Sequence, residues 1–540
     1  MAGLITIFDV SLGLLALYLL KLYLSPSTKS TSNLPLPPGP KPRPLIGNLL
    51  DLPKEYDWLH WAKHKPLYGP ISSITVFGQT LILIHSPTIA LSLFEKKSSI
   101  YSSRPTLTFG GQMCGWENSL ALQPYGHRFR SYRKNIYQLM GTKASVLSQF
   151  SELEEKETRR FLRRVLKDPE MLREHVRRWA GGIILRISHG YRVEQVGDDP
   201  LVDLADEALV QFSLSTTPGA WLVDVMPFLR YAPDWLPGTG FKRTAERWYK
   251  TLCELADKPH AFVKMQMANG TATPSYTSAL LEKLEKARND GVDAETLREE
   301  EFVIKWSAAS LYSGGADTTV SALYGFYLAM VLFPHIQARA QAEIDAVIGG
   351  DRLPTLADRE RLPYVDAVLK EVLRWNPVAP MGLPHVNTED DVYDGYFIPK
   401  GSILMANIWQ ITHDPETYHD PFEFKPERYL GENPEPDSHT LNFGFGRRIC
   451  PGKELADTSL FLSIAQTLAA FTISKPISPE TGEEYTPECH YQTGVISHPK
   501  EYRCRIGPRS ERMRRVVEEG MEGDEGVDGE GSDAKVLKEL

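Results

Sequence analysis

Residues 443–452, with the sequence Phe-Gly-Phe-Gly-Arg-Arg-Ile-Cys-Pro-Gly, surround one cysteine with residues suited to holding a thiolate. A thiolate that binds a metal needs shelter from water and backbone donors that tune its electron density. Gly446 and Gly452 let the backbone come close to the sulfur, because glycine has no side chain to obstruct it. A helix beginning after Pro451 would turn its positive N-terminal end toward the sulfur. The loop therefore predicts that Cys450 is a ligand rather than an ordinary buried cysteine.

Two further groups of polar residues lie on predicted helices. Glu371 and Arg374 are three positions apart, so on a helix they share one face. The run Ser-Gly-Gly-Ala-Asp-Thr-Thr at 313–319 lies in a helical pattern from 299 to 333 that Pro334 ends. Each of its adjacent glycines costs about 1 kcal/mol in a helix interior. Taken alone, the first pair reads as a surface ion pair, and the second run as an incidental kink whose hydroxyl bonds to its own backbone.

The loop at 443–452 resembles the signature of the cytochrome P-450 superfamily at every fixed position. The resemblance covers about residues 34–508 in the family's usual motif order. Within the microsomal class, the chain is similar to fungal secondary-metabolism monooxygenases of the O-methylsterigmatocystin oxidoreductase type. The resemblance implies a heme b cofactor, iron protoporphyrin IX, with the Cys450 thiolate as the axial ligand to the iron. It implies the following cofactor-binding residues: Cys450, Arg448, Arg133, His385, Phe443, Gly446, Gly452, Gly314 and Gly315.

Three of these residues are expected to meet the haem propionates. Arg448, two residues before the cysteine, can form charge-assisted hydrogen bonds with a carboxylate. Arg133 matches the arginine of a helix motif in which the family has Trp four residues earlier. Here that position is Phe129, which cannot donate a hydrogen bond. His385 stands where the family often places another propionate contact.

The motif at 313–319 resembles the part of the family's long central helix that lies over the haem. By resemblance, Asp317 and Thr318 are the catalytic residues and deliver protons to dioxygen. Gly314 and Gly315 are expected to leave room for the dioxygen molecule. A buried structural network that supports the haem pocket in the family maps onto three residues: Glu371, Arg374 and Arg428.

The remaining pattern predicts a mostly α-helical chain with small β-sheets, the cytochrome P-450 fold, plus an N-terminal transmembrane helix. Short β-type runs occupy 71–76, 80–84, 396–398 and 403–406, and helical patterns dominate from 146 to 372. No linker-like composition breaks the chain between residues 51 and 509. The predicted parts are a transmembrane anchor at 1–24, a proline-rich hinge at 25–48, the catalytic domain at 49–508 and a disordered charged tail at 509–540.

The N-terminal segment carries the membrane prediction. Residues 4–24 are nearly all apolar and as a helix would span roughly 30 Å, enough to cross a bilayer. Positive charges follow this run, which leaves the catalytic domain in the cytosol. A cleaved signal peptide would more often begin with basic residues and end in a small-residue cleavage site. We therefore predict a single-pass protein of the endoplasmic reticulum membrane, with a stiff proline-rich spacer at 34–48.

Composition excludes some classes of partner. The net charge is −9, without a strong basic field, so nucleic acid is not a predicted partner. The five cysteines are odd in number and widely spaced, unlike a disulfide framework. No flavin or nicotinamide motif is present, so we expect electrons from NADPH through a separate NADPH-cytochrome P-450 reductase.

These features predict a haem-thiolate monooxygenase that hydroxylates or otherwise oxidises a lipophilic small molecule with dioxygen. Two other functions stay open: a haem-thiolate isomerase or dehydratase, and a non-enzymatic haem-binding protein. The isomerases usually lack the acid–threonine pair that this chain has at 317 and 318. NADPH consumption with added reductase would separate the monooxygenase from both alternatives.

Overall fold

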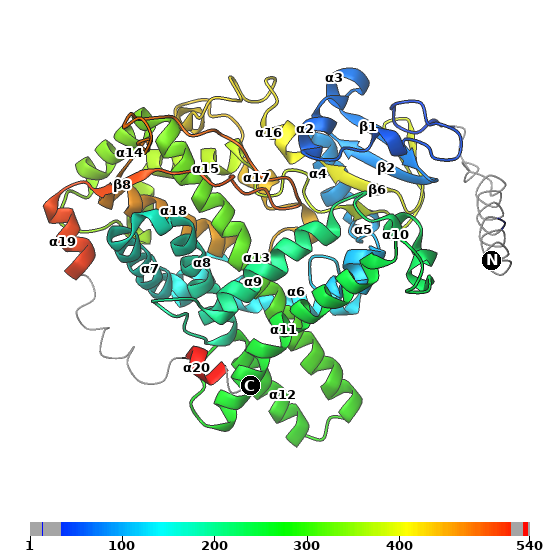
Figure 1. The fold of residues 1–540 in the computed structure, drawn as a ribbon, viewed down its shortest axis with the longest axis horizontal. Helices are drawn as coiled ribbons and strands as arrows, with labels where there is room; N and C mark the ends of the chain where they lie inside the picture. The colour runs from blue at the N-terminus through cyan, green and yellow to red at the C-terminus, as the bar shows by residue number, and fades with distance from the viewer. Residues whose placement is uncertain (1–12, 14–33, 520–532, 538–540) are drawn as a thin grey trace. The chain divides into compact units, whose positions relative to one another are not determined.

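The computed structural model describes residues 13, 34–519 and 533–537 (Figure 1). They form two compact units along an interleaved chain. Unit 1 takes the described residues of Met1–Pro105 with Met381–Ile411 and Phe445–Arg448, and unit 2 takes Thr106–Pro380, Thr412–Gly444 and the described residues of Ile449–Leu540. The predicted anchor at 1–24 lies outside the described residues apart from residue 13, so it stays a prediction.

A four-stranded sheet in the order β1-β2-β6-β3 forms the base of unit 1. β1 (Ile71–Val76) and β2 (Gln79–Ile84) make an antiparallel hairpin, joined by Phe77 and Gly78. Both joining residues have positive φ, 48° and 86°, as a tight two-residue hairpin loop requires. β6 (Ile403–Ala406) runs parallel to β2 (Figure 1). β3 (His385–Val386) runs antiparallel to β6. The predicted strands are confirmed.

The other elements of unit 1 are short helices and one small hairpin. They are η1 (Leu49–Asp51), α2 (Asp57–Ala62), α3 (His64–Tyr68), α4 (Pro87–Leu91), η2 (Ser92–Lys96), α5 (Ser98–Tyr101), β4 (Asp391–Tyr393), β5 (Tyr396–Ile398), α16 (Ile408–Thr412, whose last residue belongs to unit 2) and η9 (Gly446–Arg448).

The proline-rich segment at 34–48 is hydrogen-bonded to other parts of unit 1. The carbonyl of Pro38 accepts a hydrogen bond from the Ser73 amide at 2.9 Å, and that of Pro35 accepts one from the Phe397 amide at 2.8 Å. Proline lacks an N–H but keeps its carbonyl, so this segment can still accept hydrogen bonds from strand residues. The prediction of a spacer is therefore wrong for these residues, although they form neither a helix nor a central strand.

Unit 2 is helical, and its longest element is α13 (Ala294–Leu332). The helix begins five residues before the predicted start, because the Asp293 side chain caps it by accepting the amides of Glu295 and Thr296. It ends before Pro334 and continues without a break through its two glycines. Its most extensive packing is against α8 (Leu172–His189), and α9 (Pro200–Thr216) lies beside both (Figure 1).

The remaining elements of unit 2 complete the helical body and add one two-stranded sheet. They are η3 (Thr108–Met113), η4 (Trp116–Asn118), α6 (His127–Met140), α7 (Lys143–Lys167), η5 (Pro169–Met171), α10 (Leu222–Val225), η6 (Pro227–Tyr231), α11 (Gly240–Ala268), α12 (Tyr276–Asn289), α14 (Pro334–Val347), η7 (Leu356–Arg361), α15 (Pro363–Trp375), η8 (Pro426–Tyr429), α17 (His439–Asn442), α18 (Lys453–Ala470), β7 (Phe471–Ser474), β8 (Arg505–Pro508), α19 (Glu511–Glu519) and α20 (Asp533–Leu537).

None of the helices within the described ranges is by itself long and apolar enough to cross a bilayer. By length and composition, α13 and α14 pass the test only as a pair, and they are bent by 105° at their junction. Most side chains of the second half of α13 are buried in unit 2.

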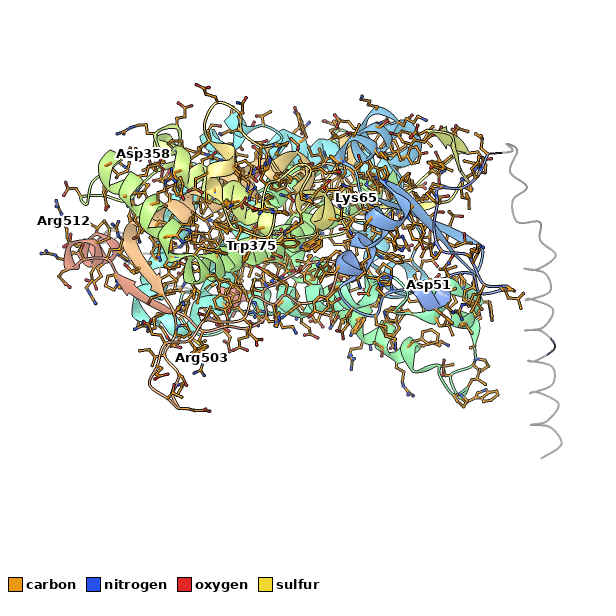
Figure 2. All side chains as sticks on the ribbon, turned by 90° about the horizontal axis from the view of Figure 1, so that it is seen from above. Asp51, Lys65, Asp358, Trp375, Arg503 and Arg512 are labelled. Carbon is orange, nitrogen blue, oxygen red and sulfur yellow. The ribbon has the colours of Figure 1, made fainter. Side chains whose placement is uncertain are left out.

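Part of the C-terminal tail forms structure where disorder was predicted. Helix α19 buries Met513 and Val517, which are four positions apart and so share one face. Arg163 on α7 donates to the carbonyl of Val517 at 3.0 Å, and Figure 2 shows Arg512 of the same helix pointing outward. The prediction is therefore wrong for α19 and for α20, because the charged, glycine-rich composition of the whole tail hid a short amphipathic repeat.

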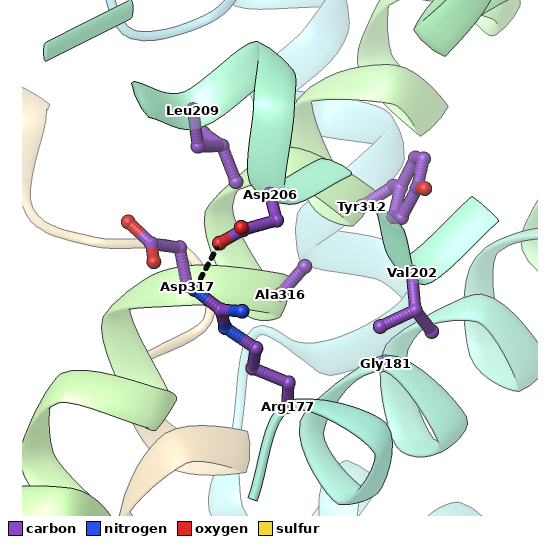
Figure 3. A pocket seen from close by; sticks show the side chains of 8 residues that line it. All are labelled: Arg177, Gly181, Val202, Asp206, Leu209, Tyr312, Ala316 and Asp317. Carbon is purple, nitrogen blue, oxygen red and sulfur yellow. Dashed lines mark ion pairs between the residues drawn. The ribbon is translucent and has the colours of Figure 1, made fainter. Parts of the chain in front are cut away.

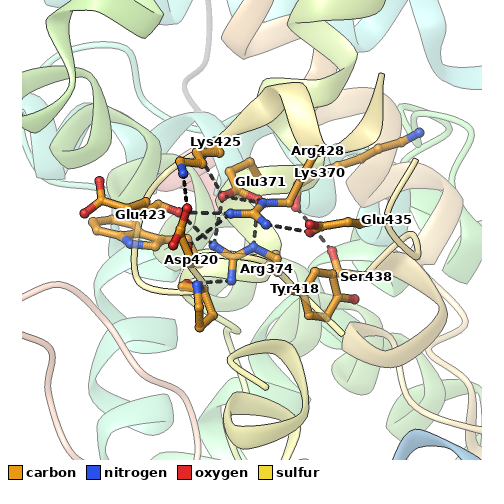
Figure 4. Close-up of polar contacts among 12 residues, drawn as sticks. Lys370, Glu371, Arg374, Tyr418, Asp420, Glu423, Lys425, Arg428, Glu435 and Ser438 are labelled. Carbon is orange, nitrogen blue, oxygen red and sulfur yellow. Dashed lines mark hydrogen bonds and ion pairs between the residues drawn. The ribbon is translucent and has the colours of Figure 1, made fainter. Parts of the chain in front are cut away.

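The three residues expected to form a network are in contact in unit 2 (Figure 4). Glu371 and Arg374 on α15 are both 0% exposed, and the guanidinium donates from Nε and Nη2 to the carboxylate at 2.8 Å each. Arg428 reaches the same carboxylate at 3.1 Å and donates to Glu435 at 2.5 Å. Desolvation disfavours the charge on Arg428, but the two carboxylates outweigh it and raise its pKa.

Backbone groups complete the same network. Arg374 also donates to the carbonyls of Thr412 and Pro421 at 2.8 Å each, and the Lys425 amide donates to Glu371 at 2.7 Å. The buried charges are thereby paired and hydrogen-bonded, and they join α15 to the chain after Thr412. A buried charge is tolerated on these terms.

Replacement of Glu371 by Gln should lower the free energy of unfolding by about 3–5 kcal/mol, because two buried guanidinium groups lose their charged partner. Glu360, which is exposed on η7, provides the matched control, and Glu360→Gln should change it by no more than about 0.5 kcal/mol. Urea unfolding followed by tryptophan fluorescence measures both variants. Equal unfolding midpoints would contradict a stabilising role for the network.

Candidate active site

Cys450 lies between η9 and α18. Its amide donates to the carbonyl of Phe443 at 2.7 Å, which closes the loop. The side chain is exposed, yet surrounding protein atoms desolvate the thiol enough to raise its pKa, while the Gly452 amide and the charge of Arg133 act to lower it. A sulfur that is accessible on one side and backed by donors on the other fits the requirements of an iron–thiolate bond.

The two loop glycines differ in what the structure requires of them. Gly446 has a φ of +49°, and a Cβ there would lie 2.5 Å from the carbonyl oxygen of Phe94, so no other residue fits. A Cβ on Gly452 would meet no described atom within 4 Å. Gly452 is instead the N-cap of α18, which begins at Lys453, as the prediction of a helix after Pro451 requires.

Arg133 on α6 lies beside the cysteine loop in unit 2. Its guanidinium donates to the carbonyl of Ile449 at 2.5 Å. Desolvation lowers the pKa of Arg133, and the neighbouring Cys450 acts in the opposite direction. Phe129, one turn earlier on the same helix, is buried. Arg133 therefore places a positive charge next to the sulfur, and its contact with a propionate stays a prediction.

Unit 1 contains a buried group of Arg448, His385 and Arg104. Arg448 donates from Nε to the carbonyl of Ser102 at 2.6 Å. His385 forms a hydrogen bond through Nδ1 to the carbonyl of Tyr101 at 2.7 Å. Desolvation and the charges of Arg104 and Arg448 hold the pKa of His385 well below its usual range. The imidazole is therefore neutral, donates from Nδ1 and presents Nε2 as an acceptor.

This protonation state bears on the propionate prediction for His385. A neutral Nε2 accepts a hydrogen bond, whereas a carboxylate needs a donor. The two arginines are therefore the stronger partners for an anion in unit 1. Sequence reasoning missed Arg104, which donates to the carbonyls of Leu383 and Pro384 at 2.8 and 2.6 Å. In the sequence, Arg104 stands between Ser103 and a proline, and this local context does not predict a buried arginine.

The two glycines of α13 face different surroundings. A Cβ on Gly315 would lie 2.6 Å from Cγ1 of Ile184 on α8, so this glycine allows the two helices to pack closely. A Cβ on Gly314 would meet no described atom within 4 Å, and that residue is exposed. The two glycines face different sides because successive residues point about 100° apart around a helix, and the prediction that they leave room for dioxygen stays a prediction.

Thr318 lies one turn after Gly314 on the same open side of α13. Its hydroxyl donates to the Gly314 carbonyl at 2.7 Å. A threonine inside a helix commonly makes this bond to the backbone. The hydroxyl keeps its acceptor lone pairs, so it can still hold a water molecule or a ligand.

Asp317 makes contact with a residue from a distant part of unit 2. Its Oδ1 lies 2.8 Å from Nε2 of His498, and the two side chains are 16% and 14% exposed. Asp317 also lines a small pocket with Arg177 of α8 and Asp206 of α9, which pair at 2.6 Å (Figure 3). Asp317 and Thr318 thus engage different partners. Sequence reasoning missed His498, because a lone histidine in a polar segment carries no signal by itself.

Within the part of the chain that the structure describes, no three His, Cys, Asp or Glu side chains gather as a metal site. A single thiolate is the protein's share of ligation when the iron is held by a porphyrin. Within unit 2, the accessible sulfur of Cys450 and the half-buried positive charge of Arg133 fit an anionic haem.

Comparison with known proteins shows similarity over most of the chain and not only at the cysteine loop. A model of the cytochrome P450 family matches residues 37–505. The chain is 52% identical over 516 residues to cytochrome P450 monooxygenase claR of Ampulloclitocybe clavipes, covering 95% of this chain and 93% of the relative. It is 50% identical over 479 residues to cytochrome P450 monooxygenase 208 of Postia placenta, covering 88% and 91%. It is 40% identical over 510 residues to O-methylsterigmatocystin oxidoreductase of Aspergillus flavus, covering 94% and 93%.

These matches confirm the resemblance that the short loop suggested. They run over nearly the whole chain, so they also cover the helices that position the loop. Relatives at this level of identity are named as monooxygenases, which are oxidoreductases. The chain belongs to the cytochrome P450 family and is a cytochrome P450 monooxygenase.

Proposed function

We propose that this monooxygenase oxidises a lipophilic small molecule in fungal secondary metabolism, using heme b, dioxygen and electrons that originate from NADPH. The observation that carries the proposal is the setting of Cys450, accessible on one side and backed by the Gly452 amide and Arg133. The metabolic setting is supported by a relative named O-methylsterigmatocystin oxidoreductase.

By resemblance to the family, residues 106–122 would line the substrate pocket, and the aromatic rings around them support a lipophilic class of substrate. Phe109 stacks on Trp221 with ring centroids 3.5 Å apart and packs edge-on against Trp248. Phe109 is 0% exposed, so these rings form packed apolar core, and a pocket beside them would be lined by groups that favour apolar or aromatic ligands.

A haem bound through a cysteine thiolate supplies the activation of dioxygen, in which one oxygen atom enters the substrate and the other is reduced to water. The chain itself contributes ligation, charge and proton movement. Cys450 would bind the iron. Arg133 in unit 2, and Arg448 with Arg104 in unit 1, offer positive charge suited to propionate carboxylates. The Thr318 hydroxyl, on the open side of α13, would hold water at the reacting molecule.

Electrons would reach the haem from NADPH-cytochrome P-450 reductase, because the sequence carries no flavin or nicotinamide motif. We also propose that residues 1–24 anchor the protein in the endoplasmic reticulum membrane with the catalytic part in the cytosol. The apolar run at 4–24 and the positive charges after it support this topology.

A Cys450→His variant that still binds haem should lose the thiolate-type spectrum of the reduced carbon monoxide complex, because imidazole is neutral and donates less electron density. Cys489, which is also exposed, provides the control, and Cys489→Ser should keep the wild-type spectrum. Absorbance difference spectra measure both. A thiolate-type spectrum retained in Cys450→His would assign the ligand role to another cysteine.

Thr318→Val removes the hydroxyl but keeps the branched shape, so we expect haem binding and folding to persist while coupling fails. More of the NADPH consumed should end as hydrogen peroxide and less as product. Thr318→Ser keeps a hydroxyl and should remain closer to wild type. The measurement is product formed per NADPH consumed, with the same reductase. Equal ratios in all three proteins would remove Thr318 from the mechanism, and an absence of NADPH use in wild type would favour an isomerase or a haem-binding protein.

A chain lacking residues 2–24 should keep its haem spectrum but sediment less with microsomal vesicles. The reason is that residues 34–48 remain and are hydrogen-bonded to unit 1, so the folded body loses none of its described contacts. Flotation on a density gradient and the carbon monoxide spectrum measure the two properties. Unchanged flotation would contradict the anchor, and loss of the spectrum would show that the N-terminal segment is needed for folding.

A further inference from the structure

We propose that His498 is a positioning residue that holds Asp317 and resupplies it with protons during the reaction. The proposal rests on the proposed monooxygenase function and extends it to a residue outside α13. Reduction of one oxygen atom to water consumes protons, and an acid that delivers them has to be reprotonated before the next cycle.

The first support is the contact itself. Nε2 of His498 lies 2.8 Å from Oδ1 of Asp317, which is hydrogen-bonding distance. The side chain of His498 is 14% exposed and that of Asp317 is 16% exposed. The pair is therefore mostly enclosed, yet the imidazole keeps a small surface through which it can exchange a proton with water.

The second support is that the backbone holds His498 in place against α13. The carbonyl of the preceding residue, Ser497, accepts a hydrogen bond from the Ser321 hydroxyl at 2.6 Å. Ser321 is one turn after Asp317, so α13 contacts the 497–498 segment twice on one face. The Ser497 amide also donates to the carbonyl of Val378 at 2.8 Å, and Ser497 is 0% exposed. The imidazole is thus presented to Asp317 by a fixed backbone.

The third support is the charge around the pair. Arg177 on α8 and Asp206 on α9 line the same pocket as Asp317, but they pair with each other at 2.6 Å (Figure 3). Arginine also keeps its proton at every pH at which proteins are folded, so Arg177 cannot transfer a proton to Asp317. Histidine is the side chain type whose charge changes near neutral pH. Of these neighbours of Asp317, His498 is therefore the one whose side chain can both give up and regain a proton.

The step is a simple proton transfer. The N–H bond at Nε2 of protonated His498 breaks and an O–H bond forms at Oδ1 of Asp317, which leaves a neutral imidazole and a neutral carboxylic acid. Asp317 then passes its proton to water on the side of Thr318 and becomes a carboxylate again. His498 regains a proton from solvent, and no electron is exchanged in any of these transfers.

The rival explanation is a static ion pair that only fixes the 497–498 segment to α13. The variants His498→Gln and His498→Lys separate the two. Gln can hold Asp317 through its amide but carries no exchangeable charge. Lys preserves an ion pair, but an unperturbed lysine has a pKa of about 10.4 and holds its proton far more tightly than histidine does.

The experiment measures product per NADPH consumed, with one reductase preparation, in wild type, His498→Gln, His498→Lys and His490→Gln. His490 lies in the same C-terminal segment and forms an exposed pair with Glu488, which makes it the matched control. We expect severalfold loss of coupling in both His498 variants and none in the control. Wild-type coupling in either His498 variant would overturn the proposal, since the static pair then suffices.

A second readout does not depend on turnover. Thermal unfolding midpoints of haem-loaded His498→Gln, Asp317→Asn and the double variant form a mutant cycle. We expect the unfolding midpoint of the double variant to fall by less than the sum of the decreases in the two single variants, because the residues are in contact. Additive losses would overturn the pairing on which the proposal depends. Absence of NADPH consumption in wild type would instead reject the proposed function, which keeps the two failures distinguishable.

Discussion

The sulfur of Cys450 has to meet two opposed demands, and much of the surrounding structure follows from them. It has to stay accessible to an iron ion, while the protein around it desolvates the thiol and disfavours its charge. The Gly452 amide and Arg133 act in the opposite direction and favour the thiolate. The hydrogen bond from the Cys450 amide to the Phe443 carbonyl closes the loop that brings these groups together. A small change in the loop would therefore alter both the accessibility of the sulfur and the charge around it.

Helix α13 shows how one helix serves two surfaces. Gly315 faces α8, where a side chain would collide with Ile184, so the helices pack closely there. Gly314 and Thr318 face the open side, where the hydroxyl bonds the backbone carbonyl one turn earlier. Close packing on one face holds the helix rigidly enough to present a particular hydroxyl on the other. The adjacent glycines thus lower helix propensity without interrupting the helix.

Charged groups inside unit 2 are paired across long distances in sequence. Glu371 is surrounded by Arg374 from its own helix and by Arg428 from a later segment, which satisfies its carboxylate without solvent. Asp317 pairs with His498 in the same manner, though at a site that keeps some exposure. A fully enclosed network suits a structural role, because neutralising any one of its charges would leave a buried charge without its partner. A pair with limited access to water suits proton exchange.

Features that depend on neighbours in sequence can be predicted from the chain alone. The cysteine loop, the strands β1 and β2, and the shared face of Glu371 and Arg374 follow from residue types and short spacings. The family could be recognised on the same basis, and the match over residues 37–505 confirms it. The partners of Asp317 and Gly315, the burial of Arg104 and the docking of α19 are decided by tertiary structure. Their contacts join segments far apart in the chain, and the side of a helix that meets each distant segment is set by packing, which no local spacing records.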